Sequence, residues 1–226
     1  MIRIRIFLLS AALGVASALP VAHAAALTNN EASSGLKAAI VRSSDLAVTQ
    51  LSANGGFLKN DKLRIELPES LRKAENLARK LGYSRQADEL VDAMNHAAEM
   101  AVVEAKPLLI QAVKKMTFKD AKDILFGPPD AATQYFQRSS SDAISAKFLH
   151  IVKKATQKVE LAQKYNEFAG QAAKLGLIGE QESNLDNYVT RKAMEGLFLT
   201  IAEQEKQIRD DPVATGSALL KKVFSP

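Results

Sequence analysis

The sequence predicts an all-α protein, folded as a single bundle of about eight or nine helices with one short extended segment near residues 57–68. Apolar residues recur at helical spacing over most of the chain, which is typical of helices that bury one face. Only residues 57–68 alternate with the two-residue period of a strand. No linker rich in Pro, Gly or Ser and no fixed repeat divides the sequence, so we expect residues 25–226 to form one domain.

The first 24 residues have the three parts of a secretory signal peptide. Arg3 and Arg5 give a positive start, residues 6–19 are almost wholly apolar, and small residues precede a cleavage site at Ala24. A membrane anchor is the alternative interpretation, but the apolar run is shorter than the ~20 residues that a spanning helix needs. We therefore expect cleavage after Ala24 and a periplasmic mature protein.

The composition restricts the chemistry of the mature chain. The sequence has no cysteine, which excludes a lipid-modified N-terminal cysteine, a thiol nucleophile and thiolate-held metals. Removing the signal peptide takes away two arginines and no acid, which lowers the formal charge from +5 to +3. The basic pairs are scattered among acids, so we expect no nucleic-acid partner. No later segment reaches the length of a membrane span, and we expect a soluble protein.

The individual helices are predicted from their apolar faces and from the residues that begin and end them. The first, over residues 32–52, buries Leu36, Ile40, Ala47 and Leu51 and stops at Asn54-Gly55-Gly56. A second helix is expected over residues 69–81, and a third from Ser84 with a kink or restart at Pro107. A capping box at Thr117 and Asp120 begins a short helix that stops at Gly127, and the next helix runs from Asp130 to a break at Ser139–Ser141. The remaining helices are expected from that break through Ile144 to residue 175, over residues 184–209, and around Leu219, Leu220, Val223 and Phe224. Residues 57–68 have no second strand to pair with, so we interpret them as an extended connection.

A polar stripe follows one face of the helix that starts at Ser84. It consists of Asp88, Asp92, Asn95 and Glu99. The stripe is either the solvated side of an amphipathic helix, which its periodicity favours, or an acidic groove for a cation or a sugar. In the second case Glu99 would be a lone carboxylate that serves as general acid in a hydrolysis.

Metal binding has a single weak candidate. His96 and Glu99 are three residues apart on one helix and could share a ligand. One such pair cannot complete the ligand shell of zinc or iron, so we expect no metal and no cofactor. The motifs of serine hydrolases, zinc peptidases, P-loop proteins and dinucleotide-binding proteins are all absent from the sequence.

Two further polar clusters are candidates for binding a ligand or a partner. Thr133, Gln134 and Tyr135 follow Asp130, which we expect to cap their helix. Tyr188, Thr190 and Arg191 form a similar cluster in the sequence YVTRK. Both clusters suit a polar ligand, but buried hydrogen bonds between helices explain them equally and are favoured. With Asn95 and Glu99, they make up the candidate binding residues.

Several stretches, taken in order, resemble a bacterial family of exported proteins known as domain of unknown function 4197. They are GFLKNDKLRIELP (56–68), MNHAAE (94–99), DAATQYF (130–136), YVTRKAMEGLF (188–198) and IRDDP with LLKKVF near the end. The resemblance implies a mainly helical periplasmic or envelope-attached protein, and it implies no activity and no catalytic residues. His96 stands where the family more usually has Arg, which weakens a metal role for it.

The sequence is compatible with three functions. The default is a non-enzymatic binding or assembly component whose partner is an unknown envelope protein or a small ligand. The alternatives are a hydrolase that uses Glu99, and a carrier that holds an apolar ligand among Phe148, Tyr165, Phe168 and Phe198. The sequence leaves open whether the chain is a monomer or a homo-oligomer. The surroundings of Glu99 are the observation that discriminates the hydrolase.

Overall fold

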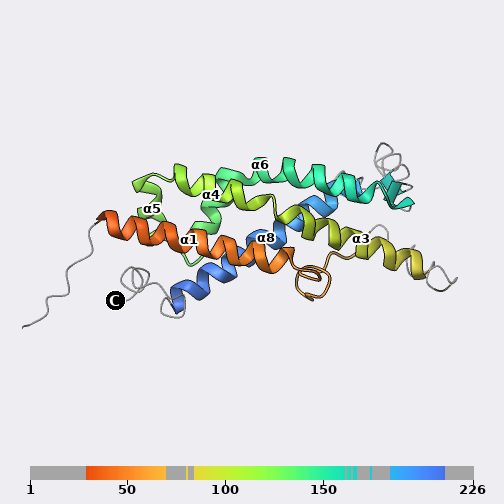
Figure 1. Cartoon of the computed structure of the whole chain (residues 1–226), viewed down its shortest axis with the longest axis horizontal. Helices are drawn as coiled ribbons and strands as arrows, with labels where there is room; N and C mark the ends of the chain where they lie inside the picture. Colours follow the sequence, from red (N-terminus) through yellow and green to blue (C-terminus); the bar gives the residue numbers. More distant parts are fainter. Residues whose placement is uncertain are drawn as a thin grey trace, which may run out of the picture.

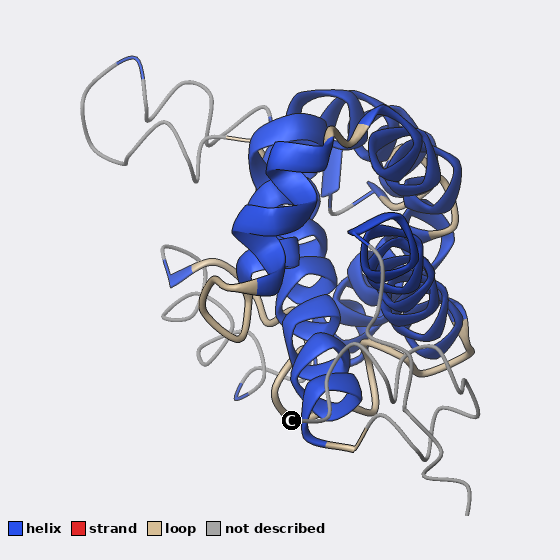
Figure 2. Ribbon diagram, turned by 90° about the vertical axis from the view of Figure 1, so that its left-hand side faces the viewer, coloured by secondary structure: helices blue, strands red, loops and turns tan. Residues whose placement is uncertain are grey.

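The structure is a computed structural model that describes residues 29–69, 80, 84–160, 162, 163, 165, 166, 174 and 184–211. These residues form six helices and no strand (Figures 1 and 2). The helices are α1 (Asn29–Ser52), α3 (Ser84–Val102), α4 (Ala105–Lys115), α5 (Phe118–Leu125), α6 (Ala131–Thr156) and α8 (Leu185–Asp210). The all-α class is confirmed, whereas the predicted count of eight or nine helices is not matched. The signal peptide, the helix expected over residues 69–81, most of residues 160–175 and the final helix lie outside the described residues.

The sequence interpretation of the serine cluster Ser139–Ser141 is wrong. We expected a break at Ser139–Ser141, but α6 runs through it without interruption. The Ser139 hydroxyl donates to the Tyr135 carbonyl oxygen one turn earlier, at 2.8 Å. A serine that bonds back to its own helix in this way is tolerated inside it. Two predicted helices are therefore one.

The predicted boundaries around α4 and α5 are confirmed. α3 ends at Val102 and α4 begins at Ala105, which makes Pro107 the third residue of α4. Its missing N–H costs nothing there, because the first amides of a helix have no intrahelical acceptor. The capping box is also present: the Thr117 hydroxyl accepts the Asp120 amide at 3.1 Å, and Asp120 accepts the Thr117 amide at 2.9 Å.

α8 is the central helix of the bundle. It packs against α6, α1 and α3, and Figure 1 shows it crossing the molecule between them. Its side chains Leu185, Val189, Leu197 and Ile201 are all fully buried. One continuous hydrophobic cluster joins α8 to the other described helices, so these helices share one core.

Residues 57–68 form a connection and no strand, but only residues 64–68 are extended: residues 57–63 are turns with local backbone hydrogen bonds, contrary to the expected extended segment. A turn that includes Gly55, with a φ of +85°, follows the end of α1 at Ser52. Beyond a second turn, Ile65 and Leu67 are buried while Arg64 and Glu66 are exposed. The alternation in the sequence thus reflects one side of an extended segment packed on the core rather than a place in a sheet.

Gly196 of α8 provides the space for this connection. A Cβ at position 196 would lie 2.7 Å from the ring carbon Cε1 of Phe57, which is fully buried. We expect Gly196→Ala to lower the free energy of unfolding by about 1–2 kcal/mol, because overpacking outweighs the higher helix propensity of alanine. Urea unfolding checks this prediction. The smaller side chain in Phe57→Leu should make Gly196→Ala less harmful, and equal effects in both backgrounds would contradict it.

Candidate binding groove between α6 and α8

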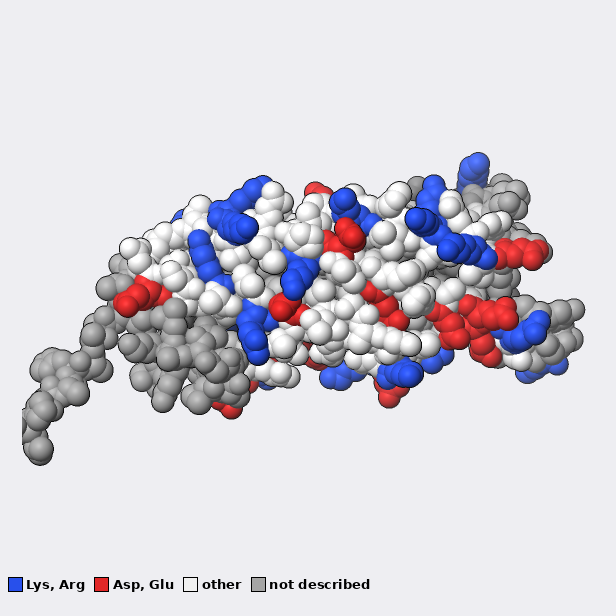
Figure 3. All heavy atoms as spheres, in the orientation of Figure 1, with Lys and Arg blue, Asp and Glu red and all other residues white. Residues whose placement is uncertain are grey.

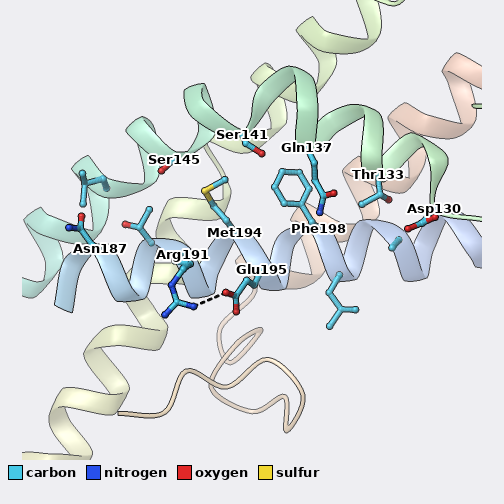
Figure 4. Close-up of a pocket in the computed structure, with 14 residues that line it drawn as sticks. Asp130, Thr133, Gln137, Ser141, Ser145, Asn187, Arg191, Met194, Glu195 and Phe198 are labelled. Atoms are coloured by element: carbon cyan, nitrogen blue, oxygen red, sulfur yellow. Dashed lines mark hydrogen bonds and ion pairs between the residues drawn. The ribbon is translucent and has the colours of Figure 1, made fainter. Parts of the chain in front are cut away.

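A surface groove of about 800 Å³ lies between α6 and α8 (Figure 4). From the α6 side it is lined by Asp130, Thr133, Gln137, Ser141, Ser145 and Leu149, and from α8 by Asn187, Thr190, Arg191, Met194, Glu195, Phe198, Leu199 and Ala202. The lining is therefore mixed: hydroxyl and amide side chains dominate the α6 wall, most of the apolar side chains come from α8, and the charged groups are few.

The α6 wall of the groove is a regular stripe. Thr133, Gln137, Ser141, Ser145 and Leu149 follow one another at intervals of four residues, so they lie on one side of the helix. The stripe covers sixteen residue steps, which corresponds to about 24 Å at the rise of an α-helix. Two of its five side chains are serines, which let an incoming backbone approach α6 closely.

The α8 wall supplies the apolar contact and the charges. Figure 4 shows Met194 and Phe198 between the two helices, whereas Arg191 and Glu195 lie along the side of α8 that faces away from α6. Arg191 donates to Glu195 at 2.8 Å and lies 5.4 Å from the centre of the Tyr188 ring. The charged side chains Arg191 and Glu195 at the rim of the groove thus pair with each other.

Hydrogen bonds hold the carboxylate on this rim in its charged form. Partial burial on its own would raise the pKa of Glu195, but hydrogen bonds from Lys192, at 2.7 Å, and from Arg191 outweigh it. The pKa of Glu195 therefore lies below its ordinary value. A general acid needs a raised pKa, so Glu195 is not suited to donate a proton near neutral pH.

Several polar groups of the groove are not bonded within the described part of the chain. The side chains of Gln137, Ser141, Ser145 and Asn187 make no hydrogen bond there. The Thr190 hydroxyl is buried and also has no partner. Gln137 and Asn187 are exposed and Ser141 and Ser145 are half-buried, so water satisfies these four side chains, whereas the buried Thr190 hydroxyl is the groove's one unsatisfied buried group among the described residues.

The predicted candidates Asn95 and Glu99 lie elsewhere, under residues 57–68. Asn95 is fully buried and its amide bonds both backbone groups of Ile65, accepting the N–H at 2.8 Å and donating to the oxygen at 2.9 Å. Glu99 Oε1 accepts the amides of Phe57 and Leu58 at 3.2 and 3.4 Å. Both side chains fasten the connection to α3.

The polar stripe of α3 is therefore only partly a solvated face. Asp88 and Asp92 are exposed, as its periodicity favours. For Asn95 and Glu99 the same interpretation is wrong, because the connection covers the second half of the stripe. His96 remains exposed and its Nδ1 is 3.5 Å from Glu99 Oε2.

Thr133, Gln134 and Tyr135 tie α6 to its neighbours. The Thr133 hydroxyl donates to Glu205 of α8 at 3.0 Å, and the Tyr135 hydroxyl donates to the Ala112 oxygen of α4 at 3.0 Å. Gln134 bonds Asp130 at 3.1 Å. Asp130 does not cap α6, contrary to expectation: Glu205 accepts the amides of the first turn instead.

Of the predicted candidates, Thr133 and Arg191 line the groove, together with Thr190 of the YVTRK cluster. Tyr188 holds residues 57–68 against α8, since its hydroxyl donates to the Glu66 backbone oxygen at 3.0 Å. The groove residues Gln137, Ser141 and Ser145 were missed. Their signal in the sequence is the interval of four residues between them, one residue after the buried stripe of Phe136, Ser140 and Ile144, which places them on the side of α6 next to that stripe.

The described residues offer no metal site. No described group of three or more His, Asp or Glu side chains could hold a metal ion. None of the described helices is both long and apolar enough to cross a membrane. Basic and acidic side chains are interspersed on the face shown in Figure 3. Phe148, Tyr165 and Phe198 are part of the packed core, and Phe168 lies outside the described residues.

The described residues thus define an all-helical bundle with one core. A long surface groove lies between α6 and α8, which run antiparallel along it. The chain belongs to the family described as "Protein of unknown function (DUF4197)", whose model matches residues 26–225. This match confirms the resemblance read from the sequence. No curated protein and no solved structure matches the chain.

Proposed function

We propose that this protein is an exported, non-enzymatic binding or assembly component of the bacterial envelope, and that its α6–α8 groove holds one amphipathic helix of a partner protein. Export rests on the signal-peptide pattern that ends at Ala24. Binding rests on one observation above all: the groove gathers accessible polar side chains that make no hydrogen bond in the described part of the chain, beside apolar ones, and the buried Thr190 hydroxyl among them also has no partner there.

A helix fits the groove better than a small molecule does. The α6 stripe is about 24 Å long, the length of about sixteen helical residues. Small-molecule sites are instead concave and enclose most of their ligand. Met194 and Leu199, which is 46% exposed, provide apolar contact for one face of the partner. Recognition would follow the helix-in-groove mode, with apolar anchors three and four residues apart.

The hydrolase alternative is less well supported. Glu99 Oε1 is occupied by two backbone amides, and residues 57 and 58 cover it. A general acid must lie within hydrogen-bond reach of its substrate, and Glu99 is not among the residues that line the groove. The apolar carrier is less well supported too, because Phe148, Tyr165 and Phe198, three of the four aromatic side chains proposed for it, pack in the core.

Site-specific photo-cross-linking in intact cells tests the proposed groove. A photoreactive amino acid at Ser145 should cross-link to one envelope protein, at peptides that map to an amphipathic helix. The matched position is Ala143, which is exposed on α6 and does not line the groove. Equal cross-linking from both positions, or none from Ser145, would contradict the proposal.

A binding measurement with the mapped helix as a synthetic peptide completes the test. We expect Ser141→Arg with Ser145→Arg to weaken peptide binding at least tenfold, because two long side chains fill the α6 wall. Ala143→Arg with Ala146→Arg, two exposed small residues of the same helix, should leave binding unchanged. Circular dichroism checks that all variants keep their helix content.

Export is tested separately by cell fractionation and mass spectrometry of the purified chain. A periplasmic protein that begins at residue 25 is the expected result. An intact residue 1, or retention in the cytoplasm, would contradict export and would leave the groove measurements valid.

A further inference from the structure

A second feature of the surface is an apolar hollow at the end of the bundle where α1 begins. Phe118 and Phe126 are 54% and 78% exposed, the two highest values among the exposed large hydrophobic side chains of the described residues. They flank a hollow of about 310 Å³ between α1 and α5, which Leu36 and Leu125 also line. Two exposed phenylalanines around one hollow indicate a surface that another apolar group covers.

The last turn of α8 lies beside this hollow. Arg209 donates to the Ile124 oxygen of α5 at 2.9 Å, and Ile208 packs on Ala39 of α1. Leu36 lines the hollow and also the crevice that contains Ile208 and Arg209. The end of α8 therefore lies close to the exposed phenylalanines, since Arg209 contacts Ile124, which is two residues before Phe126.

The sequence beyond Asp211 has the pattern needed to cover them. Fifteen residues, 212–226, follow the described part of the chain. At helical spacing, their large apolar residues Leu219, Leu220, Val223 and Phe224 share one side, while Lys221 and Lys222 fall on the other. Seven residues lie between Asp211 and Leu219, and the eight steps from one to the other can span up to about 27 Å when extended.

We propose that residues 219–224 dock in the hollow between Phe118 and Phe126 of their own chain. The four apolar side chains would meet the two phenylalanines, and the lysines would stay in water. Attachment at Asp211 favours the chain's own segment over a second copy, because a short tether gives an effective concentration in the millimolar range. This surface shares no residue with the α6–α8 groove, so the inference is independent of the proposed function.

Because the sequence has no cysteine, a cross-linker that reacts with thiols will react only at cysteines that are introduced. In the full-length protein, Lys122→Cys at the edge of the hollow is paired with Ser225→Cys next to Phe224. The control pairs Ser225→Cys with Lys206→Cys, an exposed position one turn before the end of α8 that does not line the hollow. A short bis-maleimide should join the Lys122 pair within one chain at least five times more than the control pair.

Phe126→Ser should reduce the yield of the Lys122 pair to the control level. Equal yields for the two pairs would overturn the proposal. A cross-linked dimer that disappears on dilution would overturn it in favour of a second copy of the chain. A second measurement needs no cysteine: Leu220→Ser with Phe224→Ser should at least double the fluorescence of a hydrophobic dye. Lys221→Ser with Lys222→Ser should not change it, and equal dye binding in both variants would also overturn the docking.

Discussion

Replacing Glu205 with alanine is expected to lower the free energy of unfolding by about 3–4 kcal/mol, which lies within the range usual for removing one partner of a buried ion pair. Glu205 is 5% exposed and lies in the last third of α8. Its Oε1 accepts the Ala132 amide at 3.0 Å and Arg209 Nη2 at 2.9 Å. Its Oε2 accepts the amide and the hydroxyl of Thr133, both at 3.0 Å.

The magnitude follows from what the carboxylate does at the start of α6. The first amides of a helix have no intrahelical acceptor, and the positive end of the helix dipole favours an anion there. Asp130, the residue at the cap position, makes no side-chain cap bond, so Glu205 provides this acceptor from α8. Its removal leaves buried amides without that acceptor and takes a carboxylate from Arg209. Several charge-assisted hydrogen bonds are lost together.

Urea unfolding followed by circular dichroism measures the effect. Glu203→Ala is the matched control, since Glu203 lies half a turn away and its side chain is 43% exposed in an ion pair with Lys62. An exposed pair of this kind contributes about 0–1 kcal/mol. Glu205→Gln keeps an acceptor for the amides but not the charge, so its loss should lie between the two. Equal stabilities for the two alanine variants would show that the cap contributes nothing.

The helices of this protein are predictable because their signals are local. The capping box at Thr117 and Asp120 and the restart near Pro107 depend only on neighbouring residues, and both are present. The predicted break at Ser139–Ser141 failed for the opposite reason. Serine leaves a helix or bonds back into it according to the packing around it, and here Phe136 and Ile144 anchor both sides of the cluster in the core.

The roles of the polar residues depend on partners that are distant in the sequence. Glu205 binds a residue 73 positions away, and Asn95 binds one 30 positions away. Helical periodicity contains no information about such distant partners. It therefore cannot distinguish a polar side chain that faces water from one that hydrogen-bonds another segment. The groove has the same limit: the spacing of Ser141 and Ser145 indicates a polar side of α6, but only the position of α8 makes that side one wall of a groove.

Replacing Asn95 with leucine is expected to lower the free energy of unfolding by about 3 kcal/mol. Leucine has nearly the same volume, so the change removes hydrogen bonds without leaving a large cavity. The Asn95 amide is fully buried and bonds the N–H and the oxygen of Ile65, and its nitrogen also donates to the Val91 oxygen at 2.8 Å. Leaving a buried donor or acceptor unsatisfied costs about 1–3 kcal/mol each.

The effect should be specific because Asn95 does for residues 64–68 what a neighbouring strand does in a sheet. No strand pairs with this segment in the described residues, so a side chain provides the donor and the acceptor for Ile65. The same substitution at Asn187 is the matched control, since its side chain is exposed in the groove and makes no hydrogen bond in the described part of the chain. We expect Asn187→Leu to change stability by less than about 0.5 kcal/mol. Hydrogen exchange should show faster exchange of the Ile65 amide in Asn95→Leu alone. If that amide stays protected, the connection must be held by its apolar side chains, and the role assigned to Asn95 is wrong.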